Sequence, residues 1–479
     1  MTGLSALAAS ESIRVRRWDA LVLGGALPGR IAAVQLASRG AHVLLVEEKA
    51  AAEAFPGLRD PFLVHGADPG GVLGACLEAL GIPLLERRSV ATYPVAYQVA
   101  LPDARVEVAA PPRTAEELVA WGFAVPEEAG AVVRAIGEAG AAERDAMLEA
   151  PVVRSAQRLP RAARPTASSA AARPAPLGTR RARRARGLPV AVTSAAPALA
   201  TLLAAQLRAL SNLGESAPPP EASARLLGAA LEGATVFPGG AGALSLLLRR
   251  RLEALHGELR SVSGTLRLVS AANQPGILVE ESGEVWVGRA LVLNAPRQAL
   301  AAVAGDPVPE VLRGPPVTRI RLAVRYVARR GVLPEGMAPR VICVRDPDAG
   351  MDGTNLVTLR VFPRPEGGDQ VDLVASAVVG ADERDLDARR AEIGAAVAQL
   401  MPFSADGLVL QRHPEPRWDS GAPLSDPPPG EGWPAAVELR VSTRPPVYVL
   451  ERAGMAALGF EGDVLLGWRA GDAIAADLS

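Results

Sequence analysis

Residues Asp19 to Glu48, DALVLGGALPGRIAAVQLASRGAHVLLVEE, decide the fold of this chain. The stretch begins with a short apolar run, Leu21 to Leu23, as expected of a buried parallel strand. Gly24 can make the tight turn that leaves the strand, and Gly29 lets a following helix lie close to the sheet. Apolar residues then recur at helical spacing as far as Gly40, and a second apolar run follows. The order of strand, turn, helix and strand predicts a βαβ unit.

A βαβ unit of this kind can bind the diphosphate of a dinucleotide. The helix that opens near Pro28 would point its free N–H groups and its positive dipole end at the phosphates. The second strand, Val43 to Val46, ends at Glu47, which stands 23 residues after Gly24 and can accept hydrogen bonds from a ribose. Because an acid at this place favours an unphosphorylated ribose, the sequence predicts FAD or NAD in preference to NADP.

The glycine pattern departs from the full G-x-G-x-x-G motif at one position. Ala26 stands where the second glycine is expected, and its Cβ crowds the place where the backbone approaches the phosphates. Two interpretations therefore stay open. The unit either binds a dinucleotide or persists as architecture without a ligand.

Segments much further along the chain share features with one group of flavoenzymes. Phe237-Pro238-Gly239-Gly240 precedes leucines 244, 248, 252 and 255, which form the apolar stripe of a long helix. Gly276 to Pro296, GILVEESGEVWVGRALVLNAP, predicts strands around a turn at Ser282-Gly283, the last of them buried. Together with the βαβ unit, these segments resemble the FAD-dependent amine oxidase and phytoene desaturase superfamily. The resemblance implies an α/β fold in which a Rossmann-type FAD-binding domain, assembled from discontinuous segments, adjoins an α+β substrate domain.

The C-terminal segment GDVLLGWRAGDAIAADLS is similar to the last strand and helix of that superfamily. In the superfamily a Gly-Asp pair brings this region to the ribityl and phosphate groups of the flavin. In the register that we prefer, Val464 to Gly467 is the strand, Ala470-Gly471 opens the helix, and Trp468 takes the place of the acid. In the alternative register the strand is longer and Gly471-Asp472 is the pair.

One further feature of the superfamily is missing. The Gly-Gly-Arg doublet expected shortly after the ribose acid is absent, and only Pro56-Gly57-Leu58-Arg59 is similar to it. The resemblance implies an FAD-binding domain of residues 1–90, 236–300 and 440–479, and a substrate domain of residues 91–235 and 301–439. We expect cofactor contacts from Gly24, Gly25, Ala26, Leu27, Pro28, Gly29, Arg30, Glu47, Glu48, Gly467 and Trp468.

Composition excludes several other classes of function. The chain has 51 basic and 52 acidic residues and a net charge of -1, so no global attraction to nucleic acid is expected. Its two cysteines and four histidines lack the spacing of a disulfide framework or a metal site, and we expect a cytoplasmic protein. We assign no catalytic residue, because in flavin enzymes the ring accepts the hydride and the protein mainly orients the substrate.

An arginine-rich segment interrupts the expected substrate domain. Residues 151–188 carry ten arginines and no acid, a composition typical of a disordered loop. The alternative is a cationic segment that docks on anionic lipid or nucleic acid. Residues 187–207 lack charge over a length that can cross a bilayer, but prolines and polar residues favour a buried helix, with peripheral membrane contact as the alternative.

Three functional hypotheses follow from these features. The first is an FAD-dependent oxidoreductase, desaturase-like or dehydrogenase-like, that removes a hydride from a largely apolar small molecule. The second is a degenerate relative with weak or no FAD binding that acts as a scaffold or partner-binding subunit, as Ala26, the missing doublet and Trp468 suggest. The third is a relative that uses NAD in the same βαβ unit.

Overall fold

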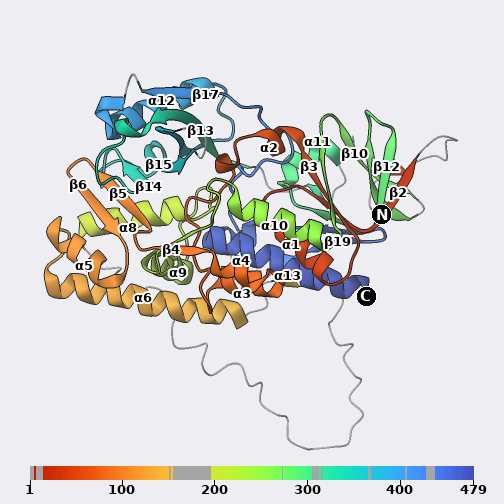
Figure 1. Ribbon diagram of the computed structural model, residues 1–479, viewed down its shortest axis with the longest axis horizontal. Helices are drawn as coiled ribbons and strands as arrows, with labels where there is room; N and C mark the ends of the chain where they lie inside the picture. Colours follow the sequence, from red (N-terminus) through yellow and green to blue (C-terminus); the bar gives the residue numbers. More distant parts are fainter. Residues whose placement is uncertain are drawn as a thin grey trace, which may run out of the picture.

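The computed structural model shows two large β-sheets, each with helices packed against it, and two further sheets of two strands each, β18-β7 and β4-β8 (Figure 1). It describes residues 5–6, 14–149, 153–154, 192, 196–271, 273–304, 312–313, 317–364, 368–404, 407–427 and 437–479. The α/β architecture, with a Rossmann-type unit in the larger sheet and a second sheet beside it, confirms the predicted fold class.

The larger sheet contains the predicted βαβ unit. Strands β2 (Val15–Leu23) and β3 (Val43–Glu48) are parallel neighbours, and helix α1 (Leu27–Ser38) connects them. The main path of the sheet has the order β1-β10-β11-β12-β2-β3-β9, and β20 pairs with β12 and β19. The other strands are β1 (Ser5–Ala6), β9 (Glu258–Val262), β10 (Leu266–Ala271), β11 (Gln274–Val279), β12 (Glu284–Leu293), β19 (Arg440–Thr443) and β20 (Pro446–Val449).

Both faces of this sheet are buried, which explains why its central strands are almost continuously apolar. On one face, Val22 and Leu45 pack in a core with α1, α10 (Ala243–Ala254) and α13 (Phe460–Leu478). On the other face, alternate strand residues enter a second core with α11 and Trp418. Helix α11 spans Arg297–Ala304.

The C-terminal segment corrects the sequence prediction. Val464 to Gly467 is not a strand, because the whole of Phe460–Leu478 is one helix, and the last strand is β20. An apolar run that is buried on all sides has no periodicity that distinguishes a strand from a helix. A Cβ added at Gly467 would collide with the carbonyl oxygen of Pro28, so α13 packs closely on α1.

The alternative register is also wrong. Asp472 lies within the same helix, and its carboxylate accepts hydrogen bonds from the side chains of Gln35 and Arg39 at the C-terminal end of α1. Gly471-Asp472 is therefore at the opposite end of α1 from the glycine loop.

The second sheet has seven strands in the order β17-β13-β16-β15-β14-β5-β6, and α12 (Leu386–Leu400) packs on one of its faces. The opposite face is directed toward the segment after β3, where the guanidinium of Arg325 lies over the ring of Phe55. Its strands are β5 (Tyr97–Leu101), β6 (Ala104–Val108), β13 (Arg319–Arg329), β14 (Arg340–Val344), β15 (Gly353–Pro363), β16 (Gln370–Gly380) and β17 (Leu408–Gln411).

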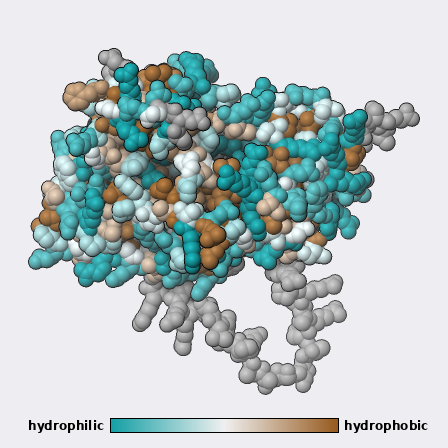
Figure 2. All heavy atoms as spheres, in the orientation of Figure 1, coloured by the Kyte–Doolittle hydropathy of each residue, from teal (hydrophilic) through white to brown (hydrophobic). Residues whose placement is uncertain are grey.

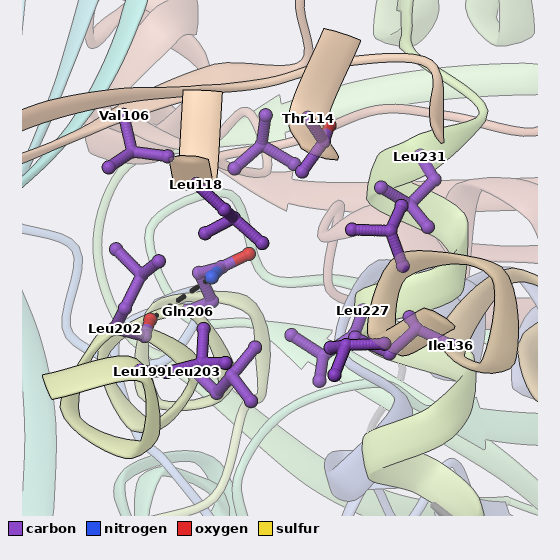
Figure 3. A pocket seen from close by; sticks show the side chains of 13 residues that line it. Val106, Thr114, Leu118, Ile136, Leu199, Leu202, Leu203, Gln206, Leu227 and Leu231 are labelled. Atoms are coloured by element: carbon purple, nitrogen blue, oxygen red, sulfur yellow. Dashed lines mark hydrogen bonds between the residues drawn. The ribbon is translucent and has the colours of Figure 1, made fainter. Parts of the chain in front are cut away.

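Four helices extend from the edge of the second sheet (Figure 1). They are α5 (Pro111–Ala120), α6 (Pro126–Glu149), α8 (Pro197–Leu210) and α9 (Pro220–Leu231). A cavity of about 30 Å³ lies among them, lined by apolar side chains together with Thr114 and Gln206 (Figure 3). This volume is about that of one water molecule, so the cavity is not a substrate pocket.

Several predictions concern segments that the structure describes only in part. Residues 151–188 lie outside the described residues apart from β7 (Val153–Arg154). The apolar segment 187–207 is helical from Pro197, where α8 begins, and Leu199 and Leu202 are buried. Across the described ranges, no helix combines the length and the apolar character needed to cross a membrane. Figure 2 shows apolar residues scattered among hydrophilic ones on the face in view.

The remaining elements are short or join the larger ones. They are α2 (Lys49–Glu53), η1 (Pro56–Leu58), α3 (Val72–Ala79), α4 (Leu84–Arg88), β4 (Ala91–Tyr93), β8 (Ala234–Val236), η3 (Arg330–Val332), η4 (Pro402–Ser404), β18 (Val437–Glu438) and η5 (Ala453–Leu458).

Candidate functional site

The glycine loop between β2 and α1 packs closely against Asn294, the residue directly after β12. Gly24 has a φ of +110°, and a Cβ added there would collide with the backbone of Asn294. The Asn294 Nδ2 donates to the carbonyl oxygens of Gly24 and Ala26, both at 3.1 Å. A Cβ at Gly29 would collide with the same asparagine. Packing within the protein therefore requires both glycines, whether or not a ligand binds.

The predicted ribose acid, Glu47, turns toward the glycine loop. Its carboxylate forms an ion pair with Arg30, whose Nε donates to the carbonyl oxygen of Gly25 at 2.7 Å. A Cβ added at Gly25 would collide with the Glu47 carboxylate, so the two residues are in close contact. Burial raises the pKa of Glu47, although the charge of Arg30 acts in the opposite direction. Glu47 is thus engaged by the protein itself.

A carboxylate that the sequence analysis did not identify binds the glycine loop. The Oδ1 of Asp419 accepts hydrogen bonds from the Gly25 N–H at 3.0 Å and from the Arg59 Nη2 at 2.8 Å. Its Oδ2 accepts from the Glu48 N–H at 3.3 Å, and the residue is only 1% exposed. Backbone N–H groups at the start of such a helix are the usual donors to phosphate, and here one of them donates to a carboxylate of the chain.

Two neighbours fix the Asp419 segment in place. The carboxylate of Glu48 accepts hydrogen bonds from the backbone N–H groups of Arg417, Trp418 and Asp419, at distances between 2.8 and 3.2 Å. The side chain of Trp418 is buried in the core of the larger sheet. Hydrogen bonds from backbone N–H groups to an ionised carboxylate are among the stronger ones in proteins. The segment after β17 is therefore attached to the Rossmann unit by both backbone and side chains.

The structure brings most of the predicted cofactor contacts together. The residues grouped at the glycine loop are Gly24, Gly25, Ala26, Leu27, Pro28, Gly29, Arg30, Glu47 and Glu48. Gly467 and Trp468 lie on the helix α13 and not on a strand, and Gly467 packs on the backbone of Pro28 in the first turn of α1. Arg59, from the segment similar to the missing doublet, does reach the site through its ion pair with Asp419. Asp419 itself carried no sequence signal, because it lies in an irregular segment 394 residues from its partner Gly25.

Comparisons with known proteins establish what this architecture is similar to. No protein-family model matches the sequence, and a comparison with curated proteins found no match. An oxidoreductase from Methanosarcina mazei is similar in structure with a TM-score of 0.56 and 13% identity, over 95% of this chain and 99% of that one. Putrescine oxidase bound to putrescine has a TM-score of 0.53 and 14% identity, over 97% and 99% of the two chains. Cyclohexylamine oxidase from Brevibacterium oxydans has a TM-score of 0.51 and 15% identity, over 96% and 99%.

The chain has the fold of putrescine oxidase and cyclohexylamine oxidase. The amine oxidase part of the predicted resemblance is thereby confirmed, and the likeness covers nearly the whole of both chains in each pair.

The amine oxidase fold implies FAD, and the glycine loop tests whether the residues present fit its diphosphate. They do not fit as they are arranged. The N–H of Gly25 already donates to Asp419, and Glu47 is paired with Arg30. The carboxylates of Glu47 and Asp419 lie at the loop, and each is already paired with an arginine, Arg30 and Arg59, so the groups that could receive a diphosphate are bound to one another. At this loop, the Gly25 N–H donates to a carboxylate of the chain itself.

Proposed function

We propose that this chain is a degenerate relative of the flavin-dependent amine oxidases, which binds FAD weakly or not at all and acts as a scaffold or partner-binding subunit. The observation that carries the proposal is the hydrogen bond from the Gly25 N–H to the buried Asp419 carboxylate. A single N–H group cannot donate well to Asp419 and to a phosphate at the same time. Ala26 and the absence of the Gly-Gly-Arg doublet support the same conclusion.

The contacts of the Asp419 segment set the size of the effect on FAD. A phosphate could replace the Asp419 carboxylate as the acceptor for Gly25 and Arg59. It could not restore the hydrogen bonds that three N–H groups of the segment donate to Glu48. If opening the segment loses two such charge-assisted hydrogen bonds, at about 1.5 kcal/mol each, the affinity for FAD falls roughly 100-fold. An FAD site that was weakened in this way would not retain the cofactor during purification.

A second candidate is the FAD-dependent oxidoreductase, which would remove a hydride from a largely apolar small molecule. The likeness to amine oxidases over nearly the entire chain favours it, as does a glycine loop that still donates an N–H to an anion. For this function the Asp419 segment would have to leave the loop before a cofactor binds. A relative that uses NAD would need the same opening.

Flavin binding separates the two candidates. We expect the purified wild-type protein to be colourless and to show no saturable quenching of flavin fluorescence when FAD is titrated. Asp419→Ala should bind FAD at least tenfold more tightly than the wild type, because the loop N–H and Arg59 become available. Asp426→Ala is the matched control, because Asp426 lies on the same segment as Asp419. Its carboxylate accepts hydrogen bonds from the N–H groups of Glu215 and Ser216 and not from the glycine loop.

A flavin spectrum in the purified wild type, or a stoichiometric FAD titration, would contradict the proposal and support the oxidoreductase. Equal FAD affinities for the wild type and Asp419→Ala, both measurable, would show that Asp419 is not an obstacle to the cofactor.

A further inference from the structure

Three arginines converge on the short segment that follows α8. On β13, the Arg321 Nη2 donates to the carbonyl oxygen of Ser211 at 2.9 Å. Two residues further along the segment, the carbonyl oxygen of Leu213 accepts from the Arg208 Nη1 at 3.0 Å. Arg452 reaches the same segment indirectly, because its partner Asp463 also lies within 3.5 Å of the Asn212 side chain.

Arg321 differs from its neighbours in how its charge is balanced. Arg208 is paired with Asp352 at 2.9 Å, and Arg452 with Asp463 at 2.6 Å. Within the described parts of the chain, the Arg321 side chain has no carboxylate partner, and its one hydrogen bond goes to a backbone carbonyl. Arg321 is therefore the surplus positive charge of this cluster.

The surroundings of Arg321 make that surplus costly. Burial, together with the charges of Arg208, Arg360 and Arg452, lowers the pKa of Arg321 to about 10, so the side chain stays protonated at neutral pH. A charge that is buried without a counterion is destabilising. The adjacent hydroxyl of Ser211 is also buried and has no hydrogen-bond partner among the described residues. Among the described residues, the guanidinium thus lacks a counterion and the neighbouring hydroxyl lacks a hydrogen-bond partner.

The guanidinium retains access to a ligand. Among the described residues, no guanidinium nitrogen of Arg321 is both fully buried and without a hydrogen bond. The residue keeps part of its surface accessible to solvent. On the same face of the sheet, Ala323 is the next residue but one along β13, and Val378 is the direct cross-strand neighbour on β16. A ligand at Arg321 would thus meet a charged fork beside small apolar side chains.

We propose that Arg321 binds the carboxylate of a small, largely apolar organic acid, at a site between β13 and residues 211–213. The planar guanidinium matches a carboxylate with two parallel hydrogen bonds, and one negative charge balances the one surplus positive charge. The site shares no residue with the glycine loop and goes beyond the proposed function, because it assigns a ligand that does not depend on FAD.

The test compares carboxylates with their uncharged amides on the full-length protein. Acetate, benzoate and octanoate are titrated by calorimetry alongside acetamide, benzamide and octanamide, with inorganic phosphate as a separate arm. At least one carboxylate should bind saturably and at least tenfold more tightly than its amide and than phosphate. Binding of no carboxylate, equal binding of a carboxylate and its amide, or tighter binding of phosphate would each overturn the assignment.

Variants at two positions of β13 locate the site. Arg321→Met should weaken the binding of that carboxylate at least tenfold, and the thermal midpoint of the free protein shows separately whether the variant is folded. Arg329→Met is the matched control at the exposed end of the same strand and should bind like the wild type. Unchanged carboxylate binding in a folded Arg321→Met or Arg321→Gln variant would show that Arg321 serves the fold only.

Discussion

Asp419 and Glu461 are both buried carboxylates, each 1% exposed, but they are compensated in different ways. Glu461, on α13, accepts two hydrogen bonds of 2.7 Å from Arg225 of α9, in the bidentate geometry that a guanidinium and a carboxylate prefer. Asp419 lies in an irregular segment and receives two backbone N–H groups and one nitrogen of Arg59.

The pKa values of the two acids move in opposite directions. Burial raises the pKa of Asp419, and the charge of Arg59 does not offset it. Burial acts on Glu461 in the same sense, but the charges of Arg225 and His65 outweigh it and lower the pKa. The difference teaches that the charge of Glu461 is fully balanced by its arginine partner. The donors around Asp419 balance the cost of burying its charge only in part.

Breaking the complete pair should have the largest effect on stability. Glu461→Gln removes the buried carboxylate that pairs with Arg225 and leaves the partly exposed Glu232 as its remaining counterion among the described residues, so we expect a loss of about 3 kcal/mol in the free energy of unfolding, measured with urea. The double variant Arg225→Met with Glu461→Met removes both charges and should recover most of that loss. A cost below about 1 kcal/mol for Glu461→Gln would show that the pair is not the stronger of the two arrangements.

A smaller loss should follow at the partly compensated acid. Arg59→Gln removes one charge-assisted hydrogen bond from Asp419 but keeps both N–H donors, so we expect a loss of about 1–2 kcal/mol by the same urea measurement. Arg39→Gln is the matched control, because the pair of Arg39 with Asp472 is largely exposed and should contribute about 0.5 kcal/mol or less. Equal losses for the two variants would mean that Asp419 is not held by Arg59.

The same two acids show how far the sequence predicts this molecule. The βαβ unit was predictable because its signals are local: two apolar runs, the glycines at the turn and an acid after the second strand all lie within residues 19–48. Around it, the helix after Gly240 and the strand pair before Asn294 also follow from local patterns.

Other features depend on distant contacts and were not predictable. The prediction of a strand at Val464 to Gly467 was wrong because residues 460–468 are buried on every side. A helix without a polar face shows no helical periodicity in its sequence. The bond between Gly25 and Asp419 joins residues 394 positions apart, and the segment of Asp419 has neither strand nor helix periodicity. Glu47 was identified correctly as an acid at the end of β3, but its pairing with Arg30 depends on the same three-dimensional closure.

The smallest expected effect is the pH dependence, and its sign distinguishes the two acids most directly. Because the pKa of Asp419 is raised above its ordinary value of 3.8, the unfolded chain ionises first as the pH rises, and the wild type loses stability from that pH upward. Asp419→Asn lacks this loss, so its stability relative to the wild type should improve between pH 3.5 and the raised pKa.

Glu461 should give the opposite slope. Its pKa lies below the ordinary value of 4.5, so the wild type has the full benefit of the ion pair above that pH and loses it as the pH falls toward the lowered pKa. The deficit of Glu461→Gln should therefore grow as the pH rises toward 4.5 and then level off, as measured by thermal unfolding in a series of buffers. Parallel slopes for the two variants would refute the comparison, because both carboxylates would then have the same electrostatic balance in the folded chain.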